Sequence, residues 1–440
     1  MPLPRIRLAL HWQILIAILL AAAAGWAAGE QGALFGLRWI AVFDFFGALF
    51  LSALKMIILP LIAASIIASI AGMGEGLGRL GARTLGFYLI SSSLAVLVGL
   101  AWVNLVAPGI SGGNPVGPAL ALEAKRATVS ADLQGGGSLG QLADIFQRMI
   151  PTNVVQAASD NGSILAVIFF SVLFGYALSR RHDAAGDTLR RFWEGIYEVM
   201  IVITDWIMRL APIGVFALVA AVVARTGFGA VQPLLVFAVT VLAALATHLF
   251  VVLPLMARVF GGARRPWRLF KPMAPALLTA FSTASSAATL PVTLEGVERA
   301  GVSRRTASFV LPLGATVNMN GTALYECVAV IFLAQAYGVH LGFVTQLLIV
   351  VTAVVTSIGV AGIPSASLVA IVVIMNAVGL PAEAIAVLFV FDRLLDMSRT
   401  AVNIYGDATC AVIVAHRSGE TGLLASGAAT PAVDNEESRD

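Results

Sequence analysis

Long apolar runs recur along the chain from Trp12 almost to His416, and many of them contain about 20 residues or more. A run of that length is enough for a helix to cross the hydrocarbon core of a bilayer. A transmembrane barrel would show alternating segments of about 10 residues, which the chain lacks. The pattern predicts an all-α polytopic membrane protein with eight transmembrane helices. Their expected centres lie near Leu19, Ile57, Val96, Phe169, Ile203, Ala243, Val328 and Ile404.

Two further apolar regions, roughly 267–297 and 341–378, do not read as single spans. Their centres, "STASSAATLP" and "SIGVAGIPSASL", are rich in Ser, Thr, Gly, Ala and Pro. Each region begins and ends on one side of the expected topology, which predicts a re-entrant helical hairpin with a broken tip. Each precedes a span with a polar interruption, and the two units enter from opposite sides. Such inverted repeats usually place a substrate site at the bilayer midplane. The alternative is that small residues only permit tight helix packing.

Composition agrees with a membrane protein, because 59% of the 440 residues are hydrophobic and only 12% are charged. The basic residues are too few and too evenly spread for a nucleic-acid face, so no nucleic-acid partner is expected. They concentrate in alternate connections between spans. By the positive-inside rule this places both termini in the cytoplasm, with the chain in the plasma (inner) membrane. The Gly- and Pro-rich stretch 108–145 is expected to be an external loop. The polar, acidic residues 418–440 are expected to form a disordered cytoplasmic tail.

The final span carries five charged residues within the stretch "DRLLDMSRTAVNIYGD". At about 100° per residue, these positions and two uncharged polar ones fall within about a third of the helix circumference. They are Asp392, Arg393, Asp396, Arg399, Thr400, Asn403 and Asp407. Each charge at the centre of an isolated span costs about 2.5–3.5 kcal/mol on insertion scales. A structural ion-pair network would offset part of that cost. A polar face lining a substrate and ion pathway is the favoured interpretation.

The residue types on this face indicate its cargo. Arg399 offers a planar fork suited to a carboxylate, and Asp396, one turn away, suits an ammonium group. Together they fit a zwitterion that carries an extra carboxylate. Asp407, with the side-chain oxygen of Asn403, suits a hard cation such as Na⁺. The polar break "NMNG" at 318–321 offers backbone carbonyls beside them.

Four motifs in one order, "STASS…TLP", "NMxGT", "GIPSAS" and "D…DMxRT…N…GD", resemble the dicarboxylate/amino acid:cation symporters. This family includes the excitatory amino acid transporters and bacterial glutamate/aspartate carriers. The resemblance implies a homotrimeric secondary symporter of glutamate or aspartate, coupled to Na⁺ or H⁺, with elevator-type alternating access and no other cofactor. One alternative is a C4-dicarboxylate:cation symporter of the same family, although that branch lacks an acidic residue at the position of Asp396. A passive anion channel is the alternative from another class.

The resemblance also implies roles for matched positions. The substrate would contact Ser285, Ser286, Thr322, Ile363, Ser367, Asp396, Arg399, Thr400 and Asn403. One cation site would use Asp407 with carbonyls of Gly314, Asn318 and Asn403. A second would use carbonyls of Thr316, Ser357, Ile358 and Val360. A third would use Tyr88, Ser91, Ser92 and the Asn318 side chain, beside position 320. Domains would follow as scaffold 1–80, transport helix 81–107, external loop 108–145, scaffold 146–226, transport domain 227–417 and tail 418–440.

Three positions depart from the family pattern. Asn320 replaces the Asp that the Asn-Met-Asp-Gly-Thr motif usually carries, which makes the third cation site doubtful. Ala284 occupies a position where some relatives have Arg, and Arg393, held by Asp392, is the expected substitute. Glu326 stands where proton-coupled relatives place their proton carrier, and the alternative is a permanently protonated or snorkelling side chain.

The chain is not expected to be an enzyme. The Gly-x-Ser-x-Gly matches at 109–113 and 136–140 fall in the predicted external loop and follow no strand, unlike a hydrolase nucleophile. No Walker-type loop for ATP is present either.

Overall fold

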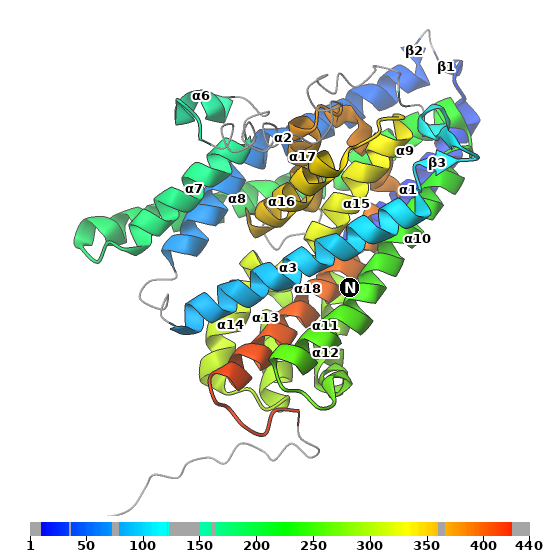
Figure 1. Cartoon of the computed structure of the whole chain (residues 1–440). Coiled ribbons are helices and arrows are strands. Elements are labelled where there is room, and N and C mark those ends of the chain that lie inside the picture. Colours follow the sequence, from blue (N-terminus) through cyan, green and yellow to red (C-terminus); the bar gives the residue numbers. More distant parts are fainter. Residues whose placement is uncertain are drawn as a thin grey trace, which may run out of the picture.

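The apolar runs of the sequence form helices throughout the computed structural model (Figure 1), which describes residues 10–34, 37–72, 79–120, 122, 150–159, 164–359 and 366–424. The α-helices of the first half are α1 (Leu10–Ala28), α2 (Trp39–Ala71), α3 (Arg79–Val106), α6 (Val154–Ser159), α7 (Ile164–Ser179), α8 (Ala184–Arg209) and α9 (Ala211–Thr226). Those of the second half are α10 (Val231–Thr247), α11 (Leu253–Phe260), α12 (Phe270–Thr283), α13 (Ser286–Arg299), α14 (Arg304–Val317), α15 (Asn320–Ala336), α16 (Phe343–Gly359), α17 (Ala366–Ala377) and α18 (Phe389–Arg417).

Every predicted span centre lies within one of these helices. By length and composition, four described helices can cross a membrane: Trp39–Ala71, Arg79–Val106, Val231–Phe260 and Arg304–Ala336. The pair α8 and α9 forms a fifth candidate, bent by 51°. Pro212 in the first turn of α9 lacks the N–H that would continue the hydrogen-bond ladder of α8, which accounts for the bend. The all-α class is confirmed, whereas the count of eight spans stays a prediction.

Helices α1, α2, α7, α8 and α9 pack mainly on one another, and α3 packs with the helices of the second half. Helix α18 runs through the middle of that second group and contacts α3 and α10 to α15 (Figure 1). A π-helical segment, His248–Val252, joins α10 to α11 and contacts both α3 and α18. The span formed by α14 and α15 is buried along its whole apolar window. The polar positions of α18 are therefore enclosed by protein.

Both regions predicted as hairpins form pairs of helices. α12 ends where Ala284 takes a left-handed conformation (φ 52°), and the Ser285 side chain then caps α13 by accepting from the N–H of Ala288. This break at the predicted tip reverses the chain, and α12 packs along α13. In the second region α16 packs along α17. Its expected tip, 360–365, lies outside the described residues.

Short strands and turns complete the described structure. Strands β1 (Ala33–Leu34) and β2 (Leu37–Arg38) pair antiparallel, as do β3 (Ile110–Ser111) and β4 (Asn114–Pro115). Gly112 and Gly113 have positive φ angles (58° and 81°), as the tight turn between β3 and β4 requires. The short helical turns are Gly117–Leu120, η5 (Pro266–Leu269) and η6 (Ala382–Leu388). Most of the expected external loop lies outside the described residues.

The chain differs from the sequence prediction just after α18. Residues 418–424, here called the C-terminal strap, were expected to be disordered. Instead, the N–H of Leu424 donates to the carbonyl of Ala300 (2.8 Å), and Leu424 is buried. The Glu420 carboxylate accepts from Ser303 and Thr306 at the start of α14. These contacts hold the strap against the turn between α13 and α14, and polar composition alone gave no sign of them.

Candidate functional site

All seven polar positions that the helical spacing groups on one face of the last span are buried in α18. Arg399 is fully buried, and Asp407, deeper along the helix, is 3% exposed. A buried charge is costly unless it is paired and hydrogen-bonded. The contacts of this face therefore decide what it can bind.

Two aspartates and two arginines form one cluster at the start of α18. Arg399 Nη2 donates to Asp396 Oδ1 (2.9 Å) and to Asp392 Oδ1 (3.3 Å). Arg393 Nη1 lies 3.7 Å from Asp396 Oδ2. The sequence prediction had Arg393 held by Asp392, but the described ion pairs join Arg393 to Asp396 and Asp392 to Arg399. Helix geometry explains the difference, because residues three or seven apart lie on the same face of a helix and adjacent residues do not.

Tyr325 of α15 completes this cluster, and sequence reasoning missed it. The guanidinium carbon of Arg399 lies 3.9 Å from the centroid of the Tyr325 ring. The Tyr325 hydroxyl donates to Asp392 Oδ1 (3.3 Å). Its position three residues after Thr322, on the same face of α15, was the available signal. The ring and the two aspartates together fix the plane of the guanidinium.

The polar interruption "NMNG" separates α14 from α15 inside the protein, and Asn403 of α18 accepts hydrogen bonds from backbone N–H groups at the buried start of α15. Asn403 Oδ1 accepts from the N–H groups of Gly321 (2.7 Å) and Thr322 (3.3 Å). Asn403 Nδ2 donates to Thr322 Oγ1 (3.1 Å). A Cβ on Gly321 would lie 2.8 Å from the carbonyl oxygen of Arg399, so only glycine allows this approach. One amide thus fixes α15 against the charged cluster.

A second polar centre surrounds Asp407. Asn318 Nδ2 donates to Asp407 Oδ1 (2.8 Å), while Asn318 Oδ1 has no hydrogen-bond partner among the described residues. A Cβ on Gly314 would lie only 2.5 Å from Asp407 Oδ1, so the backbone of α14 approaches this carboxylate closely. The structure therefore brings together Gly314, Asn318 and Asp407, three of the four residues expected at the first cation site.

The expected second cation site is described only in part. Thr316 lies near the end of α14 and Ser357 and Ile358 near the end of α16, and these two helices pack together. Ser357 is fully buried and its hydroxyl donates to the carbonyl of Val354. Val360 lies outside the described residues.

At the expected third site, Tyr88, Ser91 and Ser92 of α3 are buried. Asn320 Nδ2 donates to Ser91 Oγ (2.9 Å), and the Tyr88 hydroxyl donates to the carbonyl of Val310 (2.5 Å). An Asp at position 320 would present only acceptor oxygens, whereas the Asn320 amide points a donor at Ser91. This arrangement is unfavourable for a cation.

Glu326 of α15 is completely buried. Thr356 Oγ1 donates to Glu326 Oε2 (2.8 Å), and Oε1 has no hydrogen-bond partner among the described residues. The snorkelling alternative is therefore wrong, because the carboxyl group does not reach the surface. A proton carrier and a permanently protonated group both remain consistent with the burial.

The hairpin residues expected at the substrate have fewer side-chain contacts with other helices than the residues of α18. Ser285 is half-buried at the cap of α13, and Ser286, the first residue of α13, is buried. Ser367 of α17 is buried, and its hydroxyl has no hydrogen-bond partner in the described part of the chain. Ile363 lies outside the described residues. Thr400, which belongs to α18 and is also expected at the substrate, is buried and donates to the carbonyl of Asp396 (2.9 Å).

Comparison with known proteins identifies similar chains. The profile of the "Sodium:dicarboxylate symporter family" matches residues 10–417. The proton/glutamate-aspartate symporter of Escherichia coli is 35% identical over 84% of this chain and 84% of its own. The proton/sodium-glutamate symport protein of Geobacillus stearothermophilus is 32% identical over 94% of this chain and 96% of its own. The human neutral amino acid transporter B(0) is 35% identical over 86% of this chain and 74% of its own.

Proposed function

Because this chain belongs to the sodium:dicarboxylate symporter family, we propose that it is a secondary symporter of acidic amino acids, glutamate or aspartate, coupled to Na⁺ or H⁺. The observation that carries this proposal is the buried pair of Arg399 and Asp396, which offers a positive and a negative group 2.9 Å apart inside the protein. A substrate with two carboxylates and one ammonium group is complementary to such a pair.

Arg399 is the carboxylate-binding group in this proposal. Its Nη2 is engaged by Asp392 and Asp396, but Nε and Nη1 have no hydrogen-bond partner among the described residues. A buried guanidinium with unused donors gains most from a ligand that accepts from both in one plane, as a carboxylate does. Asp396 receives the substrate ammonium. Further polar contacts come from Ser285, Ser286, Thr322, Ser367, Thr400 and Asn403, with Ile363 closing the second hairpin over the substrate.

The acidic residue at 396 is what favours an amino acid over a C4-dicarboxylate. A dicarboxylate has no ammonium group to pair with Asp396. The Asp396 carboxylate would then repel the two carboxylates of the substrate. The arginine at 399 favours an acidic amino acid over a neutral one, since a neutral side chain would leave the unused guanidinium donors unsatisfied.

For the coupling ions we assign Na⁺ to Asp407, with oxygens of Gly314, Asn318 and Asn403. The unpartnered Asn318 Oδ1 beside Asp407 supports this assignment. A second Na⁺ uses carbonyls of Thr316, Ser357, Ile358 and Val360. The third position, at Tyr88, Ser91, Ser92 and Asn320, holds no Na⁺ in this proposal because the Asn320 amide donates into it. Glu326 carries the proton. Its carboxyl group accepts from the Thr356 hydroxyl, and its other oxygen has no hydrogen-bond partner among the described residues, which supports that role.

We propose that the two packing groups of helices move relative to each other. The segments 1–80 and 146–226 form a trimeric scaffold, and 81–107 with 227–417 form a transport domain that carries its cargo across as an elevator. The separate packing of the two groups supports this division. The protein lies in the inner membrane, and both of its termini are in the cytoplasm. The Lys55–Glu383 ion pair (3.6 Å) joins α2 to η6 across the boundary, so it must break when the transport domain slides.

The test is uptake of labelled aspartate into proteoliposomes with a Na⁺ gradient and a proton gradient imposed separately. A symporter concentrates aspartate above the external level under at least one of the gradients, and external unlabelled aspartate accelerates exchange. Succinate, which lacks the ammonium group, is the matched competitor and should compete at least about tenfold more weakly. A passive channel would only dissipate an aspartate gradient and never accumulate the substrate, which would overturn the proposal.

A further inference from the structure

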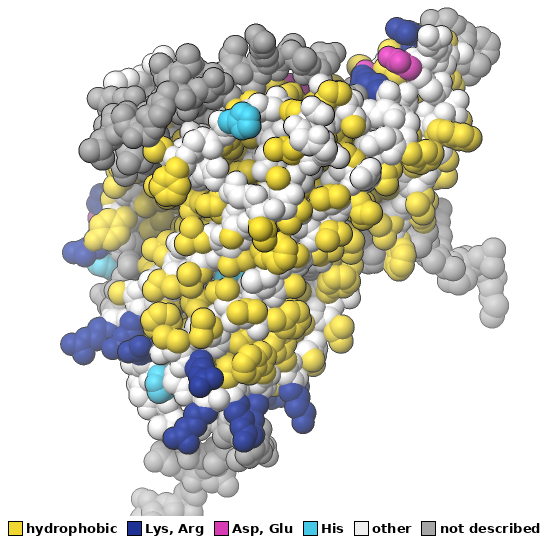
Figure 2. Space-filling model, turned by 45° about the vertical axis from the view of Figure 1, so that its right-hand side comes forward, with side chains coloured by type: hydrophobic (Ala, Val, Ile, Leu, Met, Phe, Trp, Pro, Cys, Tyr) yellow, Lys and Arg dark blue, Asp and Glu magenta, His cyan; other side chains and the backbone are white. Residues whose placement is uncertain are grey.

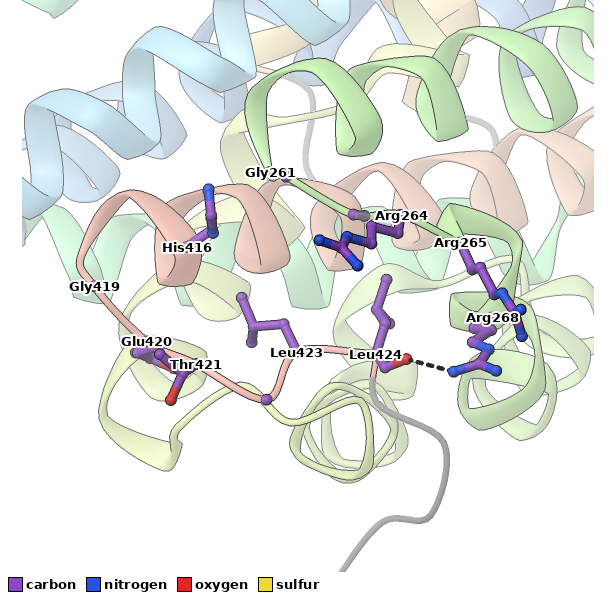
Figure 3. A pocket seen from close by; sticks show the side chains of 13 residues that line it. Gly261, Arg264, Arg265, Arg268, His416, Gly419, Glu420, Thr421, Leu423 and Leu424 are labelled. Carbon is purple, nitrogen blue, oxygen red and sulfur yellow. Dashed lines mark hydrogen bonds between the residues drawn. The ribbon is translucent and has the colours of Figure 1, made fainter.

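A pocket of about 650 Å³ lies at the end of the molecule where the basic side chains gather, away from the charged cluster of α18. Its walls are the connection from α11 to η5 on one side and the end of α18 with the C-terminal strap on the other. Figure 3 shows Arg264 and Arg265 of the connection and Arg268 of η5, with His416 and the strap beside them. The substrate and cation residues described above take no part in it.

The pocket has an unbalanced positive charge. Arg264, Arg265 and Arg268 line it, and none of them forms an ion pair with an acidic residue in the described part of the chain. Glu420 is the one acidic residue in the lining. Its carboxylate is already engaged by Ser303 and Thr306 on the α14 side. The lining therefore holds three guanidinium groups against one carboxylate, which leaves an excess of positive charge.

The walls of the pocket are fixed by contacts within the protein. Gly262 has a positive φ angle of 61°, and a Cβ there would lie 2.7 Å from the His416 ring, so this turn accommodates the ring only as glycine. Arg268 Nη1 donates to the carbonyl of Leu424 (3.3 Å; dashed in Figure 3). Leu424 in turn donates to Ala300. Arg268 is thus fixed to the strap, whereas Arg264 and Arg265 are exposed side chains on the adjoining connection.

The pocket also borders the apolar outer surface of the molecule. Trp267, next to Arg268, is 58% exposed, and Leu255 and Val259 of α11 are similarly exposed. Figure 2 shows the same order on the molecular surface, with a belt of hydrophobic side chains bordered by Lys and Arg at one end. Exposed Trp beside Arg and Lys is typical of the headgroup level of a bilayer. Ligands from the membrane and from the aqueous side can both reach this level.

We propose that this pocket binds a phosphate group, which bridges the connection before α12 to the C-terminal strap. The guanidinium fork matches two phosphate oxygens at once, and three such forks line this pocket against a single carboxylate. A bound phosphate offsets part of this positive charge and ties the end of α18 to the base of the first hairpin. The group comes either from a phospholipid headgroup or from a free phosphate, since both present the same oxygens.

The test compares two variants, each of which replaces a pair of consecutive arginines on the same side of the molecule. The variant Arg264→Gln/Arg265→Gln removes two guanidinium groups from the pocket and leaves the Arg268–Leu424 bond. The control Arg304→Gln/Arg305→Gln removes the same charge from the start of α14, outside the lining. The full-length chain is melted with inorganic phosphate against sodium chloride of equal ionic strength. In a second arm it is melted in phosphatidylcholine nanodiscs with and without a quarter of phosphatidylglycerol.

We expect phosphate or phosphatidylglycerol to raise the melting temperature of the natural chain and the control by about 3 °C or more, and that of the pocket variant by less than a third of this. A rise with phosphatidylglycerol alone identifies the lipid headgroup as the source, and a rise with inorganic phosphate identifies a free anion. Equal shifts in both variants, or none in the natural chain, would overturn the proposal. A response that appears only after removal of residues 425–440 would also overturn it, because the acidic end of the chain would then be the occupant.

Discussion

The guanidinium of Arg399 stacks on the ring of Tyr325, and both side chains are hydrogen-bonded to the same oxygen of Asp392. The three groups come from two helices, α15 and α18. Their contacts hold the guanidinium in one plane and leave its Nε and Nη1 donors unused. The affinity for an acidic substrate should therefore depend on a residue that does not touch the substrate.

Replacing Tyr325 tests this dependence. Tyr325→Leu removes the stack and the hydroxyl, and since a cation–π contact contributes about 0.5–2 kcal/mol, it should raise the KM for aspartate about 2- to 30-fold. Tyr325→Phe keeps the stack and loses only the 3.3 Å bond to Asp392, so its KM should rise less. Concentration-dependent uptake in proteoliposomes gives both values. Equal KM values for the two variants would mean that the stack contributes nothing.

Replacing Arg399 tests the choice of cargo. Arg399→Cys should abolish aspartate uptake and favour neutral amino acids, because the carboxylate loses its partner and the small thiol leaves room for an uncharged side chain. Arg399→Lys keeps the charge without the planar fork, and should retain aspartate transport with a KM raised by about tenfold or more. Competition by aspartate, serine and alanine distinguishes these outcomes. Unaltered aspartate affinity in Arg399→Cys would refute the role.

Glu326 is tested by removing its ability to ionise. Glu326→Gln keeps the size of the side chain and a carbonyl that accepts from Thr356, so the fold should survive. Net uptake should lose its dependence on pH, whereas exchange of internal for external aspartate should persist. Thr356→Val is the companion variant, since it removes the donor while leaving the carboxyl group able to titrate. An unchanged pH profile in Glu326→Gln would exclude Glu326 as the proton carrier.

Replacing Gly314 tests whether Asp407 binds Na⁺. In Gly314→Ala the new Cβ would lie 2.5 Å from Asp407 Oδ1, so the carboxylate or α14 must move. Overpacking costs about 1–3 kcal/mol, which predicts a rise of about 5- to 150-fold in the Na⁺ concentration for half-maximal uptake. Gly195→Ala is the matched control, because a Cβ there meets nothing within 4 Å. Equal Na⁺ dependence in the two variants would contradict the assignment of Na⁺ to Asp407.

Glu420 gives the strap a predictable dependence on pH. Partial burial raises the pKa of this carboxyl, but the hydrogen bonds from Thr306 and Ser303 outweigh burial and lower the pKa below its ordinary value of 4.5. The stabilisation is therefore fully present above about pH 4.5 and is lost as the pH falls through the lowered value. Melting curves from pH 7 to pH 3.5 should show Glu420→Gln below the natural chain at pH 7, with the difference closing towards acid.

A constant difference across that pH range would show that the carboxylate charge has no part in holding the strap. Glu298→Gln, which removes a carboxylate from the exposed end of α13, controls for the general loss of a surface charge.

Much of the fold follows from the sequence because apolar length and helical spacing are local properties. Each expected span centre lies in a helix, and the break at Ala284 occurs within the Ser- and Ala-rich centre of the first predicted hairpin. The π-helical segment at His248 and the 51° bend before α9 were not predicted. A π-helical turn has no composition of its own, and a proline such as Pro212 marks a break without giving its angle.

The candidate site was predictable in its members and less so in its pairings. Helical geometry groups the polar positions of α18, but it cannot say that Tyr325 covers Arg399 or that Asn403 caps α15, since both contacts join helices distant in sequence. The same limit applies to the strap, where Glu420 reaches residues over 100 positions away. Contacts of this kind depend on the packing of the whole domain.

The cluster at the start of α18 has a consequence for the unloaded transporter. Asp392 and Asp396 contribute two negative charges, and Arg393 and Arg399 contribute two positive charges. Their sum is zero, so the vacant cluster can pass through a medium of low dielectric constant without an uncompensated ion. An acidic amino acid adds one net negative charge to this balance. At least one positive ion must then accompany the substrate, which makes symport an electrostatic requirement of a neutral binding cluster.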